Sequence, residues 1–329
     1  MSLKIVVLGM MGRCPVGGQA WIYLNWLRAF SKLGHDVYYV EDDPSWPGAR
    51  DVLLAAIEGG VDWIDTAEQY YDRKNETVVA AALRDVGQPM KLSSKVAPLP
   101  DGTGYEPKQI REACEGSLER LDVDHLDMFL MHYPGESTDG LEDSWGAMRA
   151  LVDDGLTRVV GLSNFERPDV ERCLSVGPVD VLQEGLSLID HLETLELARW
   201  CKQQHIGVVT YEPLGNGMLA GAITSADDFA RVVPDYQEWG FWKRLFSPGR
   251  FERSQAVADG MRSLAERLGC SLAQLALAWN LQQAGVGATL AGTRSPAHAR
   301  ANAAAADVVL SAEDLADLDA LIPLGPTRA

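Results

Sequence analysis

The sequence predicts an α/β fold: a closed barrel of eight parallel strands, each followed by a helix. Apolar runs of strand length alternate with amphipathic stretches of helix length along most of the chain, and this alternation is typical of parallel βα units. The chain has 329 residues, which is enough for a barrel of about 250 residues and additional material. Seven predicted strands lie between residues 61 and 291, so a closed barrel requires one more strand from upstream.

The seven strands are short runs of large apolar residues. The first is VDWID, at residues 61–65. The other six span residues 91–96, 126–131, 157–163, 179–183, 207–211 and 286–291. Helical patterns separate these runs, for example at residues 107–121 and 271–284.

Two upstream segments could supply the eighth strand. KIVVLG, at residues 4–9, has the more apolar composition, as expected of a fully buried strand. DVYYVE, at residues 36–41, directly precedes the helical pattern at 49–60. The short connection favours 36–41 as the first strand of the barrel, and the other segment is then surplus.

A long connection at about residues 215–262 follows the strand at 207–211. It contains a group of aromatic residues: Phe229, Tyr236, Trp239, Phe241, Trp242 and Phe246. Connections of this length in a compact domain are usually functional or disordered. The aromatic residues favour an ordered lid that determines substrate choice, and the alternative is a purely structural extension.

The overall composition excludes several classes of protein. A formal charge of −18 and a pI of about 4.7 argue against nucleic acid as a partner. Five widely spaced cysteines without a CxxC pair indicate reduced thiols rather than a disulfide framework or a zinc site. No apolar run approaches the roughly 18 residues of a membrane span, and the opening residues resemble a strand rather than a signal peptide. We therefore expect a cytoplasmic protein; the sequence does not indicate its oligomeric state.

Polar residues occur where the predicted strands end, which is where a βα barrel carries its active site. The strand at 61–65 ends on Asp65, and Tyr70 lies on the loop beyond it. The remaining strands end at or near Lys95, His132, Ser163 with Asn164, Gln183, Tyr211, and the segment from Gly292 to Ser295. Strands that only build a core rarely all end in this way.

Several of these residues belong to motifs of a known family. The motifs are GVDWIDTAEQY, SSKV, LERLDVDHLDMFLMHYP, GLSNF, YEPLGNGMLAG, LALAWNL and AGTRSPAHARAN. By their order and spacing, residues from about 48 to 322 resemble the aldo-keto reductase family. The resemblance implies a (β/α)8 TIM barrel and an oxidoreductase that reduces aldehydes or ketones with NADPH and uses no metal; NADH is the alternative cofactor.

The resemblance also implies a catalytic set of Asp65, Tyr70, Lys95 and His132. Tyr70 would donate the proton, and Lys95 would lower the phenol pKa from about 10 towards neutrality. Asp65 would hold Lys95, and His132 would orient the carbonyl oxygen. Taken singly, these residues have ordinary explanations: Asp65 as a helix N-cap, Tyr70 and Lys95 as surface residues, and His132 as a core histidine.

The cofactor contacts implied by the resemblance lie at the later strands. Ser163, Asn164 and Gln183 would bind the nicotinamide carboxamide, and Tyr211 would stack on its ring. The turn after Tyr211 would offer backbone N–H groups to the pyrophosphate, and the last strand would bind the adenosine part of the cofactor. The residues concerned are Glu212, Leu214, Gly217, Gly292, Thr293, Arg294, Ser295, His298 and Asn302. A simple helix-start turn is the alternative for the segment GTRS.

The chain departs from the family at its start and around the predicted phosphate site. Residues 3–47 resemble the opening βαβ unit of a GT-B glycosyltransferase, so we divide the chain into an atypical N-terminal βαβ segment (1–47) and a reductase-like barrel (48–329). Glu212 stands where the family usually has Ser, and it would add negative charge near the phosphates. His298 stands where many NADPH-dependent relatives have Arg.

These departures leave other functions open. The main alternative is a catalytically impaired or inactive protein that arose by fusion and binds or regulates. Binding of a sugar nucleotide by the segment at 3–47 is a third hypothesis, although GT-B sites need two facing domains.

Overall fold

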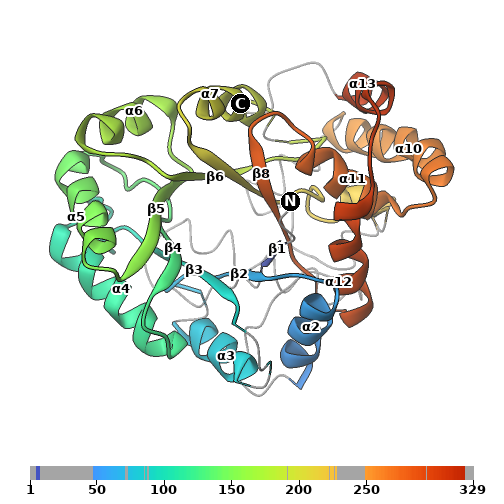
Figure 1. Ribbon diagram of the computed structural model, residues 1–329. Coiled ribbons are helices and arrows are strands. Elements are labelled where there is room, and N and C mark those ends of the chain that lie inside the picture. Colours follow the sequence, from blue (N-terminus) through green and yellow to red (C-terminus); the bar gives the residue numbers. More distant parts are fainter. Residues whose placement is uncertain are drawn as a thin grey trace.

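Eight parallel strands form a closed barrel in the computed structural model, and helices surround it (Figure 1). The structure describes residues 5–7, 47–70, 73–84, 86, 89–190, 192–221, 223–225, 227, 249–293 and 295–322. The strands follow one another around the barrel in chain order, and each is parallel to both neighbours. The predicted fold class is therefore confirmed.

The strand bounds agree closely with the sequence pattern. The strands are β1 (Ile5–Val7), β2 (Trp63–Asp65), β3 (Lys91–Val96), β4 (Leu126–Met131), β5 (Thr157–Ser163), β6 (Val181–Gly185), β7 (Gly207–Tyr211) and β8 (Val286–Ala291). The prediction for β6 was two residues too early. The backbone N–H of Asp180 donates to Val160 O, and its carboxylate accepts the Val160 N–H at 3.0 Å, so regular pairing with β5 starts only at Val181.

The first strand is the upstream segment that connection length disfavoured. Ile5–Val7 pairs with Trp63–Asp65 of β2 on one side and with Leu290 and Ala291 of β8 on the other. The preference for residues 36–41 was therefore wrong. Loop-closure entropy grows only slowly with loop length, so a short connection is weak evidence for strand order. Residues 8–46 lie outside the described part of the chain, and the GT-B-like segment and the boundary at 47 stay predictions.

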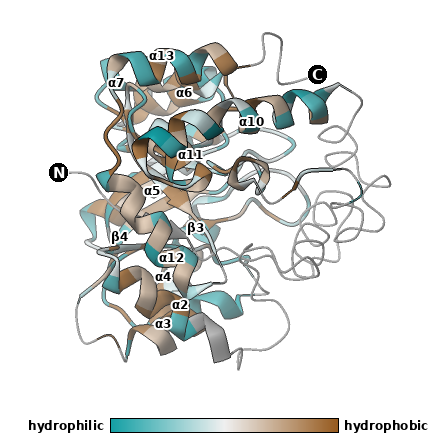
Figure 2. Cartoon of the chain, turned by 90° about the vertical axis from the view of Figure 1, so that its right-hand side faces the viewer, coloured by the Kyte–Doolittle hydropathy of each residue, from teal (hydrophilic) through white to brown (hydrophobic). Residues whose placement is uncertain are grey.

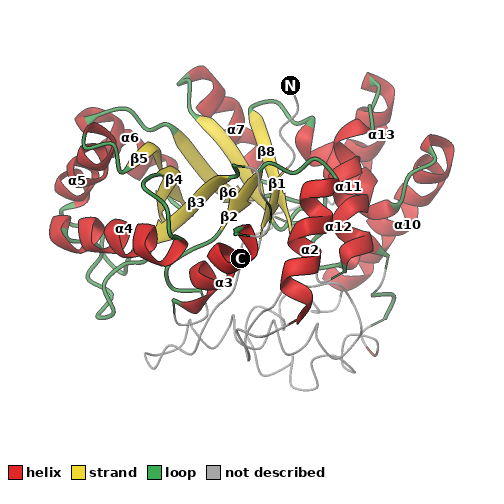
Figure 3. Cartoon of the chain, turned by 60° about the horizontal axis from the view of Figure 1, so that its bottom comes forward, coloured by secondary structure: helices red, strands yellow, loops and turns green. Residues whose placement is uncertain are grey.

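The helices lie outside the strands and cover the barrel (Figure 3). They are α2 (Pro47–Glu58), α3 (Lys74–Leu83), α4 (Pro107–Leu121), α5 (Leu141–Asp153), α6 (Arg167–Val176), α7 (Thr194–Gln203), η1 (Met218–Ala220), α10 (Arg250–Leu268), α11 (Leu272–Leu281), α12 (Pro296–Ala303), η3 (Ala304–Asp307) and α13 (Ala312–Leu321). Helix α10 already begins at Arg250, so the connection predicted at about residues 215–262 ends at Gly249. The six aromatic residues predicted to form a lid lie outside the described residues.

Local signals explain where several helices begin. Ser271 caps α11: its hydroxyl accepts the N–H of Gln274, and the Gln274 side chain accepts the Ser271 N–H. This is a capping box, which satisfies two N–H groups that a helix start otherwise leaves unpaired. Ser311 and Asp314 do the same at α13. Figure 2 shows that α10 and α13 carry both hydrophilic and hydrophobic residues, as expected of helices at the surface.

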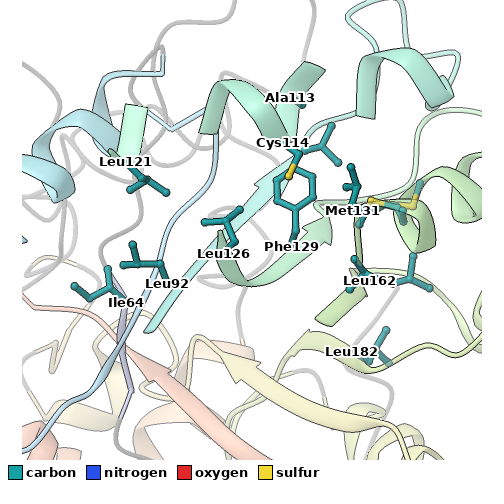
Figure 4. Close-up of a cluster of buried hydrophobic side chains, with 14 of the residues drawn as sticks. Ile64, Leu92, Ala113, Cys114, Leu121, Leu126, Phe129, Met131, Leu162 and Leu182 are labelled. Atoms are coloured by element: carbon teal, nitrogen blue, oxygen red, sulfur yellow. The ribbon is translucent and has the colours of Figure 1, made fainter. Parts of the chain in front are cut away.

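The main core lies between the strands and the outer helices. Figure 4 shows Phe129 of β4 beside Cys114 of α4 and Leu92 of β3 beside Ile64 of β2; all four belong to the same buried cluster. A smaller apolar cluster of Val209, Ala288 and Leu290 includes the partly buried Trp63 and Tyr211. Because strand side chains alternate between the two faces, the residues not used in the outer core point into the barrel.

Two further predictions concern membrane spans and the cysteine thiols. No described helix is long and apolar enough to cross a membrane. Cys114, Cys173 and Cys201 are free and buried in the structure, and burial raises the pKa of each thiol to about 12. Thiols with such pKa values are inert at neutral pH.

Candidate active site

Asp65 and Lys95 form a buried ion pair at the ends of β2 and β3. Lys95 Nζ contacts Asp65 Oδ2 and donates to Thr66 O at 2.8 Å. Both side chains are 1 % exposed. Burial lowers the pKa of Lys95, but the charge of Asp65 and the hydroxyl of Tyr70 outweigh burial, and the pKa lies above its ordinary value. Lys95 is therefore a permanent ammonium group inside the barrel.

Tyr70 lies beside this ion pair, on the loop after β2. The backbone N–H of Glu68 donates to Lys95 O at 3.1 Å and fixes the loop to the end of β3. Lys95 Nζ lies 5.3 Å from the centroid of the Tyr70 ring. Burial raises the pKa of Tyr70 above its ordinary value, and the Lys95 ammonium opposes this increase without cancelling it. The sequence-based expectation of a net lowering was wrong because it omitted the burial of the phenol.

His132 completes the group from the end of β4. Its ring centroid lies 5.4 Å from that of Tyr70, with the planes at 73°. Burial and the Lys95 charge keep the pKa of His132 well below its ordinary value, so the imidazole is neutral. Within the described residues, Nδ1 of His132 is buried and has no hydrogen-bond partner. A neutral imidazole can donate one N–H to a carbonyl oxygen without supplying charge.

The predicted carboxamide contacts lie next to this group, at the ends of β5, β6 and β7. The Asn164 amide donates to His132 O at 2.9 Å and to Ser163 Oγ at 3.0 Å. Its oxygen accepts the Tyr211 hydroxyl at 2.5 Å. Gln183 Nε2 donates to Asp65 Oδ1 at 3.1 Å. The structure thus brings the predicted catalytic and carboxamide-binding residues together at neighbouring strand ends.

The turn after Tyr211 differs from the expectation. The backbone N–H groups of Gly215 and Gly217 donate to carbonyls of the same segment, as do those of residues 218–221. Most of the donors expected to face a pyrophosphate are therefore used within the turn. Burial and the charge of Asp190 raise the pKa of Glu212 to about 8, so this carboxyl group is largely protonated at neutral pH. The expected extra negative charge at Glu212 is largely absent.

The segment after β8 has the geometry of a helix start. Thr293 is buried, and its hydroxyl accepts the Ser295 N–H at 3.2 Å. Ser295 caps α12 by accepting the His298 N–H at 3.3 Å. Arg294 lies outside the described residues. Gly292 lies beside Thr293, and Asn302 lies within α12; their proposed contacts with the cofactor stay predictions.

Two residues of the cluster were not identified from the sequence. Ser93 donates to Asp65 Oδ1 at 2.6 Å, and Glu68 accepts the Ala97 N–H at 3.2 Å. The alternation of β3 could have identified Ser93, because it lies two positions before Lys95 and so faces the same side. Glu68 gave no comparable signal. Among the residues that the structure describes, no group of histidine, cysteine or acidic side chains could hold a metal ion.

Comparison with known proteins identifies the family of the chain. The aldo/keto reductase family matches residues 42–323. The chain belongs to this family. It is therefore an oxidoreductase of the carbonyl-reducing type, as its strand-end motifs predicted.

Solved structures of other family members have the same fold. An aldo-keto reductase from Klebsiella pneumoniae in complex with NADPH is 28% identical, with a TM-score of 0.66 over 100% of this chain and 97% of that one. A glycerol dehydrogenase from Gluconobacter oxydans is 22% identical, with a TM-score of 0.74 over 98% and 94% of the two chains. A thermostable aldo-keto reductase in complex with the inhibitor epalrestat is 24% identical, with a TM-score of 0.68 over 95% and 94%. The last two are similar in fold alone.

Proposed function

We propose that this member of the family reduces small aldehydes or ketones to alcohols with NADPH, and that Tyr70 donates the proton. The observation that carries the proposal is the convergence of Tyr70, Lys95 and His132 at neighbouring strand ends, with Lys95 held by the buried Asp65. A phenol, an ammonium group and a neutral imidazole around one point can together receive the negative charge that develops on a carbonyl oxygen.

The residues at the ends of β5, β6 and β7 fit the nicotinamide end of the cofactor. When bound, NADPH supplies a hydride to the carbonyl carbon. Asn164 and Gln183 have amide groups that can pair with both the donor and the acceptor of a carboxamide. Tyr211 is partly exposed at the end of β7, where its ring can stack on a planar group and fix the face that it presents. The Klebsiella relative, which is solved with NADPH, supports this choice of cofactor.

The chain's own residues then handle the oxygen and its proton. His132 donates a hydrogen bond that orients the carbonyl oxygen towards the Tyr70 hydroxyl. Tyr70 transfers its proton to that oxygen as negative charge develops there. The Lys95 ammonium stabilises the resulting phenolate, and Asp65 holds Lys95 in position. Water then returns a proton to Tyr70.

The proposal is tested by following the absorbance of NADPH at 340 nm with an aromatic aldehyde as substrate. We expect steady oxidation of NADPH by the wild-type protein. A general acid contributes about 10²–10⁴-fold, so Tyr70→Phe should lower kcat by that factor while the protein still binds NADPH. A wild-type rate no higher than that of Tyr70→Phe would refute the proposal. Replacing NADPH with NADH measures the preference between the two cofactors.

A catalytically impaired or inactive binding or regulatory protein is the second candidate. The internal use of the N–H groups at 215 and 217–221 favours it, because fewer donors remain for the pyrophosphate of a cofactor. Titration with NADPH, followed by quenching of tryptophan fluorescence, separates the candidates. Tight binding of NADPH without turnover would indicate a binding or regulatory protein. Measurable turnover would show that the protein is also an active enzyme.

A further inference from the structure

A serine beneath the catalytic group contacts Asp65 directly. Ser93 is fully buried in β3, two residues before Lys95, and its hydroxyl donates to Asp65 Oδ1 at 2.6 Å. The indole N–H of Trp63 donates to the same hydroxyl oxygen at 3.3 Å. Ser93 Oγ accepts this hydrogen bond and donates its own hydrogen to the carboxylate.

The contacts of Asp65 divide between its two oxygens. Oδ2 contacts Lys95 Nζ, whereas Oδ1 accepts hydrogen bonds from Ser93 and from Gln183 Nε2, at 2.6 and 3.1 Å. Ser93 makes the shorter of the two bonds to Oδ1. A carboxylate bonded at both oxygens has a fixed rotation about its last bond, and that rotation determines where Oδ2 meets the ammonium group.

We propose that Ser93 is a positioning residue for carbonyl reduction: its hydroxyl orients and partly neutralises Asp65, and through Asp65 it sets the place and charge balance of Lys95 beside Tyr70. This inference rests on the proposed function and deepens it. Among the described residues, the hydrogen bonds of Ser93 join Trp63, the Ile64 carbonyl and Asp65, and of these only Asp65 contacts Lys95, so Ser93 acts through Asp65.

The charge balance at Tyr70 predicts the consequence of removing the hydroxyl. In the described part of the chain, the titratable groups that face the phenol are Asp65 from β2, Lys95 from β3 and the neutral His132 from β4. The Lys95 charge favours the phenolate, whereas the Asp65 charge opposes it. Without the Ser93 hydroxyl, Oδ1 keeps the donor from Gln183 among the described residues, so more of the Asp65 charge is left uncompensated and the carboxylate that positions Lys95 is less firmly oriented. Both effects move the ionisation of Tyr70 to higher pH.

The adjacent residue in β3 provides a matched control. Ser94 is also fully buried, and its hydroxyl also donates to a carboxylate, Glu76 Oε1, at 2.6 Å. Glu76 belongs to α3, outside the barrel, where Arg120 Nε pairs with it at 2.6 Å. Ser93→Ala and Ser94→Ala therefore remove the same kind of buried hydrogen bond from opposite faces of one strand.

A second pair of variants separates the hydroxyl from the packing. Thr and Val have nearly the same shape, so Ser93→Thr and Ser93→Val add similar volume, but only Thr keeps a hydroxyl. The far-UV circular dichroism and the Tm of every variant are compared with those of the wild type. Even if the added volume disturbs the fold, the difference between Thr and Val still reports the hydroxyl.

The kinetic test measures kcat, KM and the pH profile of NADPH-dependent reduction. For Ser93→Ala we expect kcat to fall about tenfold, the scale of one hydrogen bond to a charged group, with KM little changed. The basic limb of the profile should move to higher pH. Ser93→Thr should retain more activity than Ser93→Val, and Ser94→Ala should keep the wild-type profile. An unchanged profile in Ser93→Ala, or equal effects of Ser93→Ala and Ser94→Ala, would overturn the inference.

A spectroscopic titration tests the inference without turnover. The absorbance of tyrosinate is followed against pH in the wild type and in Tyr70→Phe, and their difference isolates Tyr70 from the other tyrosines. The same difference is then measured in the Ser93→Ala background. A shift of the Tyr70 transition to higher pH supports the positioning role even if the wild type reduces no carbonyl, in which case only the proposed function fails. A Tyr70 transition at the wild-type pH overturns the role of Ser93.

Discussion

Replacing Lys95 by methionine should lower the free energy of unfolding by about 3 kcal/mol, because the buried Asp65 carboxylate loses its cation. Lys95→Met keeps most of the side-chain volume but leaves Asp65, which is 1 % exposed, without its cation. Breaking a buried ion pair on one side commonly costs about 3–5 kcal/mol. Ser93 and Gln183 still donate to Asp65 Oδ1, so we expect the lower end, about 3 kcal/mol in the free energy of unfolding.

The double variant Asp65→Asn/Lys95→Met makes this prediction sharper. It removes both charges, so the cost of an unpaired buried carboxylate disappears, and it should be more stable than Lys95→Met alone. Urea denaturation followed by circular dichroism measures all four proteins of the cycle at one pH. A Lys95→Met protein as stable as the wild type would refute the reasoning. So would a double variant whose destabilisation equals the sum of the two single effects.

Three other predictions follow from single contacts. Glu212 has a pKa of about 8 in the folded protein against about 4.3 in an unfolded chain, so between these pH values the folded state holds a proton that the unfolded state releases, and stability should fall as pH rises. In Glu212→Gln the Tm should depend less on pH in that window. A Tm that falls with pH as steeply as in the wild type would contradict the assignment. Gly161 leaves no room for a Cβ, which would overlap Val181 O and lie 2.8 Å from Leu130 Cδ2. Gly161→Ala should therefore lower the free energy of unfolding, measured by urea denaturation, by about 1–3 kcal/mol. The control Gly146→Ala, in open space on α5, should not lower it, and equal effects of the two variants would contradict the reasoning. Because burial and Lys95 keep the pKa of His132 well below its ordinary value, its ring ¹⁵N shifts, assigned with a His132→Asn variant, should remain those of a neutral imidazole at a pH where free imidazole is protonated; a protonated ring there would contradict it.

The sequence predicted those elements that local pattern controls. The strands at 91–96, 126–131, 157–163, 207–211 and 286–291 have the predicted bounds, as does the helix at 107–121. Each is a run whose apolar spacing and turn residues agree with its final environment. The first strand was wrongly chosen because pairing between Ile5–Val7 and β8 joins segments that are distant in the chain, and no local signal reports such a pairing.

The sequence predicted that the four residues of the proposed catalytic set lie together, but not their electrostatics. The family resemblance assigned roles to Asp65, Tyr70, Lys95 and His132, and parallel strands in a barrel bring such strand ends together. The direction of the Tyr70 pKa and the protonation of Glu212 were missed. Both depend on burial, which is a property of the surroundings in three dimensions and not of neighbours in the chain.

The sequence alone therefore determined the βα order, the family and the residue types at the strand ends, because these follow from side-chain periodicity and short motifs. Only the tertiary structure decided which upstream strand closes the barrel and which oxygen of Asp65 meets Lys95. It also brought Ser93 against Asp65 of the proposed catalytic group and turned Ser94, its neighbour, towards Glu76. The physical reason is that contact distances and desolvation arise only when distant segments pack together, and these two quantities set the charge of every group in the site.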